Sequence, residues 1–185
     1  LYGGKAIVDG SVGVSSESPS IALTFGLSEV DINRLLNSIG SEYETNGKLY
    51  ITGSARTFGK TPFNWTNDLK MEVKFSARDV EFFGFDLGKI VNESSKLFSV
   101  IDMEELVKKS MAAGQTFFNS VDGDISINNT ILKATDFKII SRRIRGKFAG
   151  NISLVNFAIN SIAKLGFRPE PRRRVILGLT MNGTL

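Results

Sequence analysis

Apolar and polar residues alternate along many segments of this chain, and this pattern constrains the fold more than any other feature. In the segment NDLKMEVKFSARD, residues 67–79, every second residue from Leu69 to Ala77 is apolar and those between them are charged or polar. Successive side chains of a β-strand point to opposite faces, so a period of two predicts a strand with one apolar and one solvated face.

The same period recurs in five other segments, which are residues 20–27, 48–55, 121–131, 143–154 and 175–185. Strands of a parallel sheet are covered on both faces and are apolar on both, whereas these are apolar on one face only. The sequence therefore predicts a mainly β protein of the α+β class, built on a long antiparallel sheet. Two or three short helices are expected to pack on its apolar face.

Helical spacing appears in two capped segments and one weaker segment. In residues 28–40, Asp31 is placed as the N-cap and Gly40 as the stop signal. In residues 100–114, Asp102 and Glu105 are placed as a capping box. A shorter helix is expected after Asp86. The connections at residues 15–20, 56–67 and 166–174 are too short for interdomain linkers, so residues 1–185 are expected to form a single domain.

Composition removes most catalytic and metal-binding chemistry from consideration. The chain has neither cysteine nor histidine, which excludes disulfides, thiolate nucleophiles, imidazole bases and the usual zinc ligands. Gly59-Lys60-Thr61 matches the end of a phosphate-binding loop, but the first glycine of that motif is missing. Pro62 also stands where the helix of that motif must start. Asp122 and Asp124 lack the glycine and glutamate of a calcium loop. We predict no enzymatic activity, no catalytic residues, no cofactor and no metal site.

Basic residues cluster in residues 141–147 and 167–174, within a chain of net charge +4. The candidates for contact with lipid headgroups or with a protein partner are Arg142, Arg143, Arg145, Arg172, Arg173 and Arg174. A solvated strand face and a basic loop are the simpler explanation of these residues, and no nucleic-acid partner is predicted.

Four phrases in a fixed order carry a resemblance to a known family. They are ARDVEFFGFDLGKIV at residues 77–91, QTFFNSVDGDISINNTILKATDFKII at residues 115–140, GKFAGNISL at residues 146–154 and GTL at residues 183–185. Their order resembles the C-terminal region of the AsmA family, envelope proteins related to TamB and YhdP. The resemblance covers residues 47–185, with residues 1–46 as additional strands and a helix. Asn129 departs from it by replacing a turn glycine, and the arginine-rich FRPEPRRR at residues 167–174 has no counterpart.

The resemblance implies a location and a function that the residues alone do not give. It implies a fragment of a longer chain, anchored by a missing N-terminal segment in the inner membrane of a Gram-negative bacterium, with its body in the periplasm. It also implies a curved, groove-like sheet with an apolar interior, used in phospholipid transport between the membranes and in outer-membrane biogenesis. Lipid acyl chains and other envelope proteins would then be its partners.

The phenylalanine-rich segment VEFFGFDLGKIV, residues 80–91, is the centre of the predicted groove. The candidate groove residues are Phe75, Phe82, Phe83, Phe85, Leu87, Ile90 and Phe148. Alternation does not decide whether Phe82 or the pair Phe83 and Phe85 faces inward, because a bulge is possible at Gly84. The same rings could simply fill the space between sheet and helices. As an alternative function, the chain could be an assembly module that binds proteins through its sheet edges or its basic loop.

Overall fold

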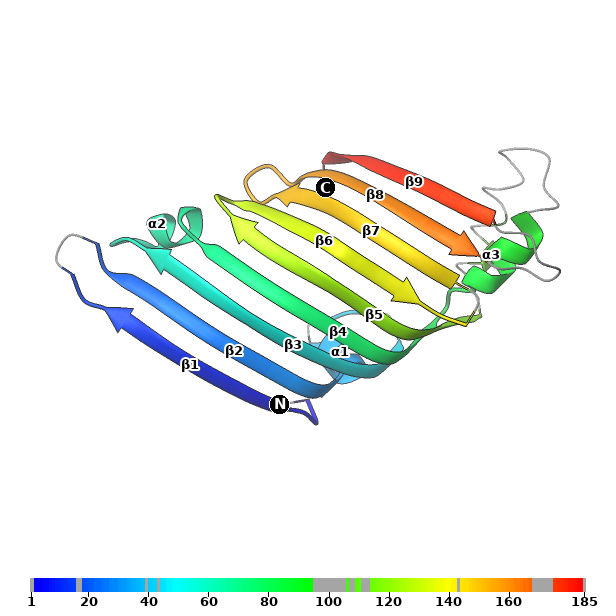
Figure 1. The fold of residues 1–185 in the computed structure, drawn as a ribbon, viewed down its shortest axis with the longest axis horizontal. Helices are drawn as coiled ribbons and strands as arrows, with labels where there is room; N and C mark the ends of the chain where they lie inside the picture. The colour runs from blue at the N-terminus through cyan, green and yellow to red at the C-terminus, as the bar shows by residue number, and fades with distance from the viewer. Residues whose placement is uncertain are drawn as a thin grey trace.

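The fold is a single open sheet of nine antiparallel strands, seen in a computed structural model (Figure 1). The structure describes residues 2–15, 18–38, 40–42, 44–94, 106, 109–110, 114–142, 144–167 and 175–184. The strands are β1 (Lys5–Gly13), β2 (Ser20–Asp31), β3 (Thr45–Phe58), β4 (Lys70–Phe83), β5 (Gln115–Asn128), β6 (Ile131–Ile140), β7 (Ile144–Ser153), β8 (Ala158–Phe167) and β9 (Val175–Thr184). Each strand pairs with the next along the chain. The predicted mainly β class, with a curved antiparallel sheet and short helices, is confirmed.

The register of the strands places the apolar residues of neighbouring strands directly opposite one another. These residues form apolar rows that cross the whole sheet. Among the rows that span all nine strands, the one farthest from the main core is called here the open row. It consists of Gly10, Leu23, Ala55, Met71, Ile127, Leu132, Ile152, Ile159 and Gly183, each directly opposite the next. Residues in register share a face, so every strand contributes to one continuous apolar face.

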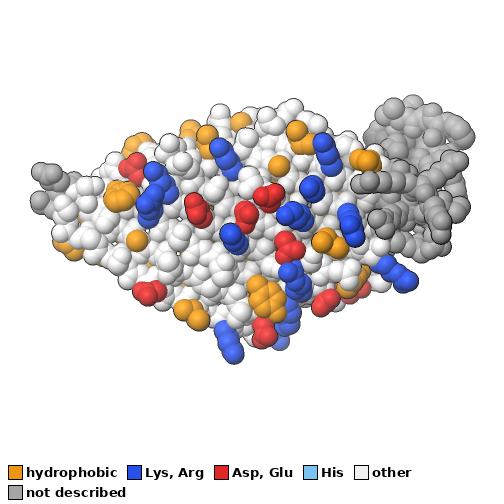
Figure 2. Space-filling model, viewed as in Figure 1, with side chains coloured by type: hydrophobic (Ala, Val, Ile, Leu, Met, Phe, Trp, Pro, Cys, Tyr) orange, Lys and Arg blue, Asp and Glu red, His pale blue; other side chains and the backbone are white. Residues whose placement is uncertain are grey.

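The opposite face of the sheet is polar. Figure 2 shows this face, where charged side chains gather over the middle of the sheet and hydrophobic side chains are scattered among them. Arg78 and Asp122 form an ion pair across β4 and β5, with 2.7 Å between Nη1 and Oδ1. This face matches the solvated side expected from the alternation.

Bulges with an acidic residue at positive φ interrupt three of the strands. Glu29 in β2, Asp79 in β4 and Asp136 in β6 have φ values of 59°, 50° and 51°. Register shifts accompany all three bulges, in the β2–β3 pairing for β2, the β3–β4 pairing for β4, and the pairings of β6 with both its neighbours. A bulge bends its strand and increases the local twist. These three residues thus help the sheet to curve.

The main core lies at one end of the sheet, where helices α1 (Ile32–Ser38) and α3 (Leu87–Ser94) connect β2 to β3 and β4 to β5. In Figure 1, α1 lies behind the polar face and α3 lies at the same end. Both helices begin after an aspartate, because Asp31 accepts a hydrogen bond from the amide of Arg34 and Asp86 accepts one from the amide of Lys89. The buried cluster consists of Ala77, Val80, Leu87, Ile90, Phe118 and Ile144.

A third short helix, α2 (Pro62–Asn67), lies at the opposite end of the sheet between β3 and β4. The expectation of an irregular connection here, with Pro62 opposing a helix start, is wrong. Proline is tolerated at the first helical position because no amide is needed there, and the Thr61 side chain caps the helix by accepting from the amide of Asn64. The Trp65 carbonyl accepts a hydrogen bond from buried Thr57, which holds α2 against the sheet.

The predicted helices after Asp31 and Asp86 are confirmed as α1 and α3. The helix expected in residues 100–114 falls largely outside the described residues, although Leu106 and Ser110 are helical and buried. Within the described ranges, every helix is too short or too polar to cross a bilayer.

Candidate functional site

Among the described residues, no helix lies over most of the apolar face away from α1 and α3. Along the open row, Leu23 is 41% exposed, and Met71, Ile127 and Ile152 are partly exposed, whereas Val80 beside α3 is 2% exposed. The neighbouring row includes Val8, which is 67% exposed. The face therefore divides into a helix-covered core and an uncovered trough that runs across the strands.

A strip of aromatic rings borders the trough on the side of the core. Phe75, Phe137 and Phe148 of β4, β6 and β7 stack in series, with ring centroids 4.7 Å and 5.6 Å apart. Gly123 of β5 makes room for them, because a Cβ atom there would lie 2.6 Å from the Phe137 ring and 2.8 Å from the Phe75 ring. Edge-to-face contacts between rings favour this arrangement. Phe75 and Phe148 are among the groove residues predicted from the sequence. Phe137 is not, because its place depends on the bulge at Asp136.

The phenylalanine-rich segment lies mainly in the helix-covered core. Phe82 faces inward opposite Thr116 and contacts the Phe118 ring at a centroid distance of 6.1 Å, whereas Phe83 pairs with Gln115. Phe82 and Phe85 pack against the buried cluster that contains Leu87 and Ile90. The possible bulge at Gly84 does not occur within the strand. The bulge is instead at Asp79, and it shifts the inward phase from odd-numbered to even-numbered residues.

A buried hydroxyl joins α3 to the sheet. The Thr116 Oγ1 atom donates a hydrogen bond to the Phe85 carbonyl and accepts one of 3.0 Å from the Leu87 amide. Thr116 is 4% exposed, so these backbone groups have little access to water. The contact satisfies polar groups of the chain at the entry to α3 and fixes that helix on the apolar face.

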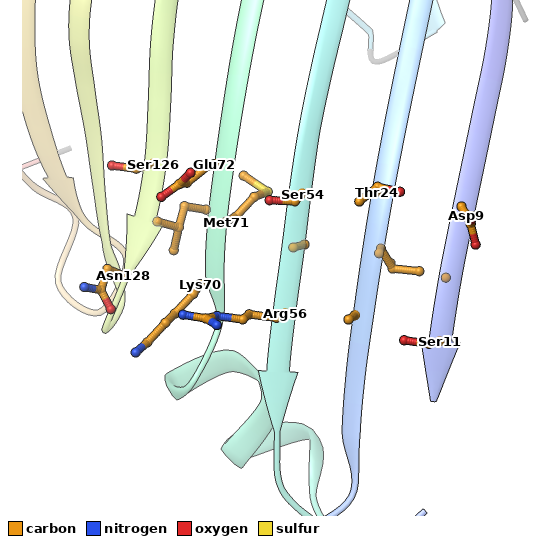
Figure 3. Close-up of a pocket in the computed structure, with 15 residues that line it drawn as sticks. Asp9, Ser11, Thr24, Ser54, Arg56, Lys70, Met71, Glu72, Ser126 and Asn128 are labelled. Atoms are coloured by element: carbon orange, nitrogen blue, oxygen red, sulfur yellow. The ribbon is translucent and has the colours of Figure 1, made fainter. Parts of the chain in front are cut away.

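A shallow hollow of about 800 Å³ crosses β1 to β5 near α2 (Figure 3). Five residues of the open row line it, flanked by two rows of the opposite face. These flanking rows are Asp9, Thr24, Ser54, Glu72, Ser126 and Ser11, Ala22, Arg56, Lys70, Asn128. In Figure 3, Arg56 extends from β3 toward Lys70 on β4. None of these pairings could be predicted from the sequence, because only the register of the strands brings the residues together.

The ion-paired carboxylate of Asp122 has an altered pKa. Partial burial favours its protonated form, but hydrogen bonds from Ser76, Arg78 and Ser120 together with the charge of Arg78 outweigh that effect and lower its pKa below the usual value. The lowered pKa of Asp122 thus arises from structural contacts on the polar face. Among the described residues, no three potential metal ligands lie together.

The predicted basic candidates are only partly described. Arg145 lies exposed on the polar face of β7, and Arg142 is exposed in the turn before it. Arg143 and Arg172 to Arg174 lie outside the described residues.

Comparison with known proteins gives one match. The model of the AsmA family matches residues 1–137. This range includes the first 46 residues, which the sequence resemblance left aside, and it ends before the later phrases of that resemblance. No curated protein and no solved structure matches the chain. The AsmA family is associated with the bacterial cell envelope. Because the match covers more than half of its length, this chain belongs to the AsmA family.

Proposed function

We propose that the trough on the apolar face holds lipid acyl chains and that the protein is a non-enzymatic lipid carrier of the bacterial envelope. The observation that supports this most is the open row, which is in register from β1 to β9 while the described core helices sit over only one end of the sheet. Apolar surface of this extent needs an apolar partner. Acyl chains fit a long surface that lacks specific polar contacts along its middle.

The energetics of the trough suit passage more than tight binding. Burying one methylene group gains about 0.8 kcal/mol relative to water, so a chain of about 16 carbons gains on the order of 10 kcal/mol. A bilayer offers nearly the same gain, and the net change on leaving it for the trough is therefore small. Because the open row repeats similar aliphatic groups from strand to strand, a bound chain meets no strongly preferred position.

The same proposal extends to location and partners. In it, the protein acts in the periplasm of a Gram-negative bacterium, tethered to the inner membrane, and moves phospholipid toward the outer membrane with other envelope proteins. Membership in an envelope-associated family supports this placement. The open row consists of aliphatic residues and glycines, and it offers no acid, base or nucleophile for catalysis.

Photo-crosslinking tests the proposal. With a photoreactive amino acid at Val73 or at Ile125, which face each other on the apolar side of β4 and β5, we expect covalent adducts with phospholipid in cell envelopes. The same amino acid at Lys74, the next residue along β4, places the probe on the polar face and should give at least tenfold less adduct. Mass spectrometry of the purified protein identifies the adducts.

Two results would count against the acyl-chain proposal. One is equal lipid labelling from both faces, which would indicate nonspecific contact with membrane. The other is a probe at Val73 that crosslinks only to protein and not to lipid, which would indicate that a partner polypeptide covers the trough.

A second candidate function is assembly through the sheet edge, and the exposure of β1 favours it. All nine residues of β1 are exposed, and Ile7, Val8 and Val12 have exposed fractions of 76%, 67% and 67%. An edge strand with apolar side chains on both faces can pair with another strand. In this role, the edge would bind a protein partner or a second copy of the chain.

Lysine at the edge tests this alternative. If β1 mediates association, the purified chain should form oligomers, and Ile7→Lys with Val12→Lys should convert them to monomers because edge charges oppose strand pairing. Multi-angle light scattering measures the mass. The control, Ile131→Lys with Ile140→Lys, alters exposed isoleucines of interior strand β6 and should leave the mass unchanged. A monomeric wild-type chain would argue against self-assembly through β1.

A further inference from the structure

Charge is distributed unevenly along the chain. Residues 1–137, which the family model matches, contain thirteen basic and eighteen acidic residues, a formal charge of −5. Residues 138–185 contain ten basic residues and one acidic residue, a formal charge of +9. A large asymmetry of this kind indicates a surface that meets anions.

Three lysines of this basic part stand in one row on the polar face. Lys138 of β6 is directly opposite Lys147 of β7, which is directly opposite Lys164 of β8. All three are exposed, and adjacent strands lie about 4.8 Å apart. Like charges directly opposite each other destabilise a sheet, so folding alone does not account for this lysine ladder.

The acidic groups nearby do not neutralise the lysine ladder. Asp122 is opposite Lys138, but its carboxylate is already bound by Arg78 and Ser76. Asp136 lies in the β6 bulge, and no described ion pair joins either carboxylate to the lysine ladder. Strands β7 to β9 contain no acidic residue at all. At the upper edge of Figure 2, over these strands, blue and orange side chains are visible without red ones.

The rows on either side of the lysine ladder are apolar and basic. One contains Ile140, Arg145, Gly166 and Ile176 in register, and the other contains Ala149, Ile162 and Thr180. Ile140, Ile162 and Ile176 are 42%, 49% and 61% exposed on this otherwise solvated face. The polar face of β6 to β9 thus combines cationic groups with exposed aliphatic groups.

We propose that this face docks on a membrane surface rich in anionic phospholipid, with the lysine ladder and Arg145 against headgroup phosphates and the isoleucines at the acyl boundary. Mixed basic and aliphatic side chains are what interfacial binding requires. A nucleic-acid surface would instead offer aromatic rings for base stacking, and this face presents aliphatic side chains in their place. The inference is independent of the acyl-chain function, because it concerns the opposite face of the sheet.

Vesicle co-sedimentation tests the proposal with the 185-residue chain. We expect binding to vesicles of phosphatidylcholine with about one quarter phosphatidylglycerol at low salt, weaker binding at high salt, and little binding to phosphatidylcholine alone. Lys138→Gln, Lys147→Gln and Lys164→Gln together should weaken binding about hundredfold, since each lysine near an anionic surface contributes about a factor of five. Ile162→Ser should weaken it several-fold.

A matched variant separates the lysine ladder from net charge. Lys48→Gln, Lys70→Gln and Lys74→Gln remove three exposed lysines from the same face on β3 and β4 and should change binding less than threefold. Circular dichroism confirms that each variant is folded. An equal loss in both triple variants would overturn the proposal, as would unchanged binding of Ile162→Ser or tighter binding to a double-stranded DNA oligomer than to the vesicles.

Discussion

Replacing Val80 with aspartate is expected to unfold the protein. Val80 is 2% exposed and lies opposite Phe118, within the cluster that joins the sheet to α3. A carboxylate there would be buried without a partner, which costs on the order of 4 kcal/mol or more, a large part of the stability of a typical domain. Urea denaturation followed by circular dichroism should show no cooperative transition.

The control for this prediction is Val8→Asp. Val8 lies on the same apolar face but is 67% exposed on β1, so the change should cost about 0.5 kcal/mol or less. The comparison isolates the effect of helix cover. Equal destabilisation by the two substitutions would show that the stability of the sheet does not depend on the core beneath α3.

The second large effect is expected from Thr116→Val. This change keeps the side-chain volume but removes the hydroxyl that pairs with the Phe85 carbonyl and the Leu87 amide. Two buried backbone groups then lose their partner, at about 1 to 3 kcal/mol each before any relaxation. We expect a loss of about 2 to 4 kcal/mol in the free energy of unfolding, measured by urea denaturation.

Thr116→Ser distinguishes the hydrogen bonds from packing. Serine retains the hydroxyl and should restore most of the stability that valine loses. Hydrogen exchange adds a local measurement, because the Leu87 amide should exchange faster in the valine variant. Slow exchange at Leu87 in both variants would contradict the role assigned to this hydroxyl.

The strands were largely predictable from the sequence because alternation is a local property. The segment from Leu69 to Ala77 contains enough residues to establish both the strand and its inward face, and it falls within β4 except at its first residue. The two aspartate-capped helices were predictable for the same reason. Their caps and apolar spacing lie within a few residues of each other.

The side chains that face inward beyond a bulge could not be predicted from the sequence. Asp79 adopts a left-handed conformation that aspartate tolerates, and this changes the inward phase for Val80 and Phe82. In the segment VEFF, residues 80–83, either the odd-numbered or the even-numbered residues could face inward. The sequence therefore did not decide which phenylalanine ring faces the core. The α2 helix was missed for another reason. Pro62 was weighed as a breaker, although at the first helical position it is compatible with a helix.

The candidate sites were less predictable than the strands because they depend on register. The division of the apolar face into core and trough follows from where α1 and α3 fold back on the sheet. The lysine ladder requires three strands to be aligned to the residue, across a bulge at Asp136. A shift of one residue in any of these pairings would move a lysine to the other face.

The strictly sequential strand order has a consequence for how such proteins can change in length. Every pairing joins strands that are neighbours in sequence, so a β-hairpin inserted or deleted at a turn would leave the other connections intact. Two added strands would widen the sheet by about 10 Å and extend each cross-sheet row by two positions. Gene duplication of single hairpins would therefore lengthen such a molecule without redesigning its fold.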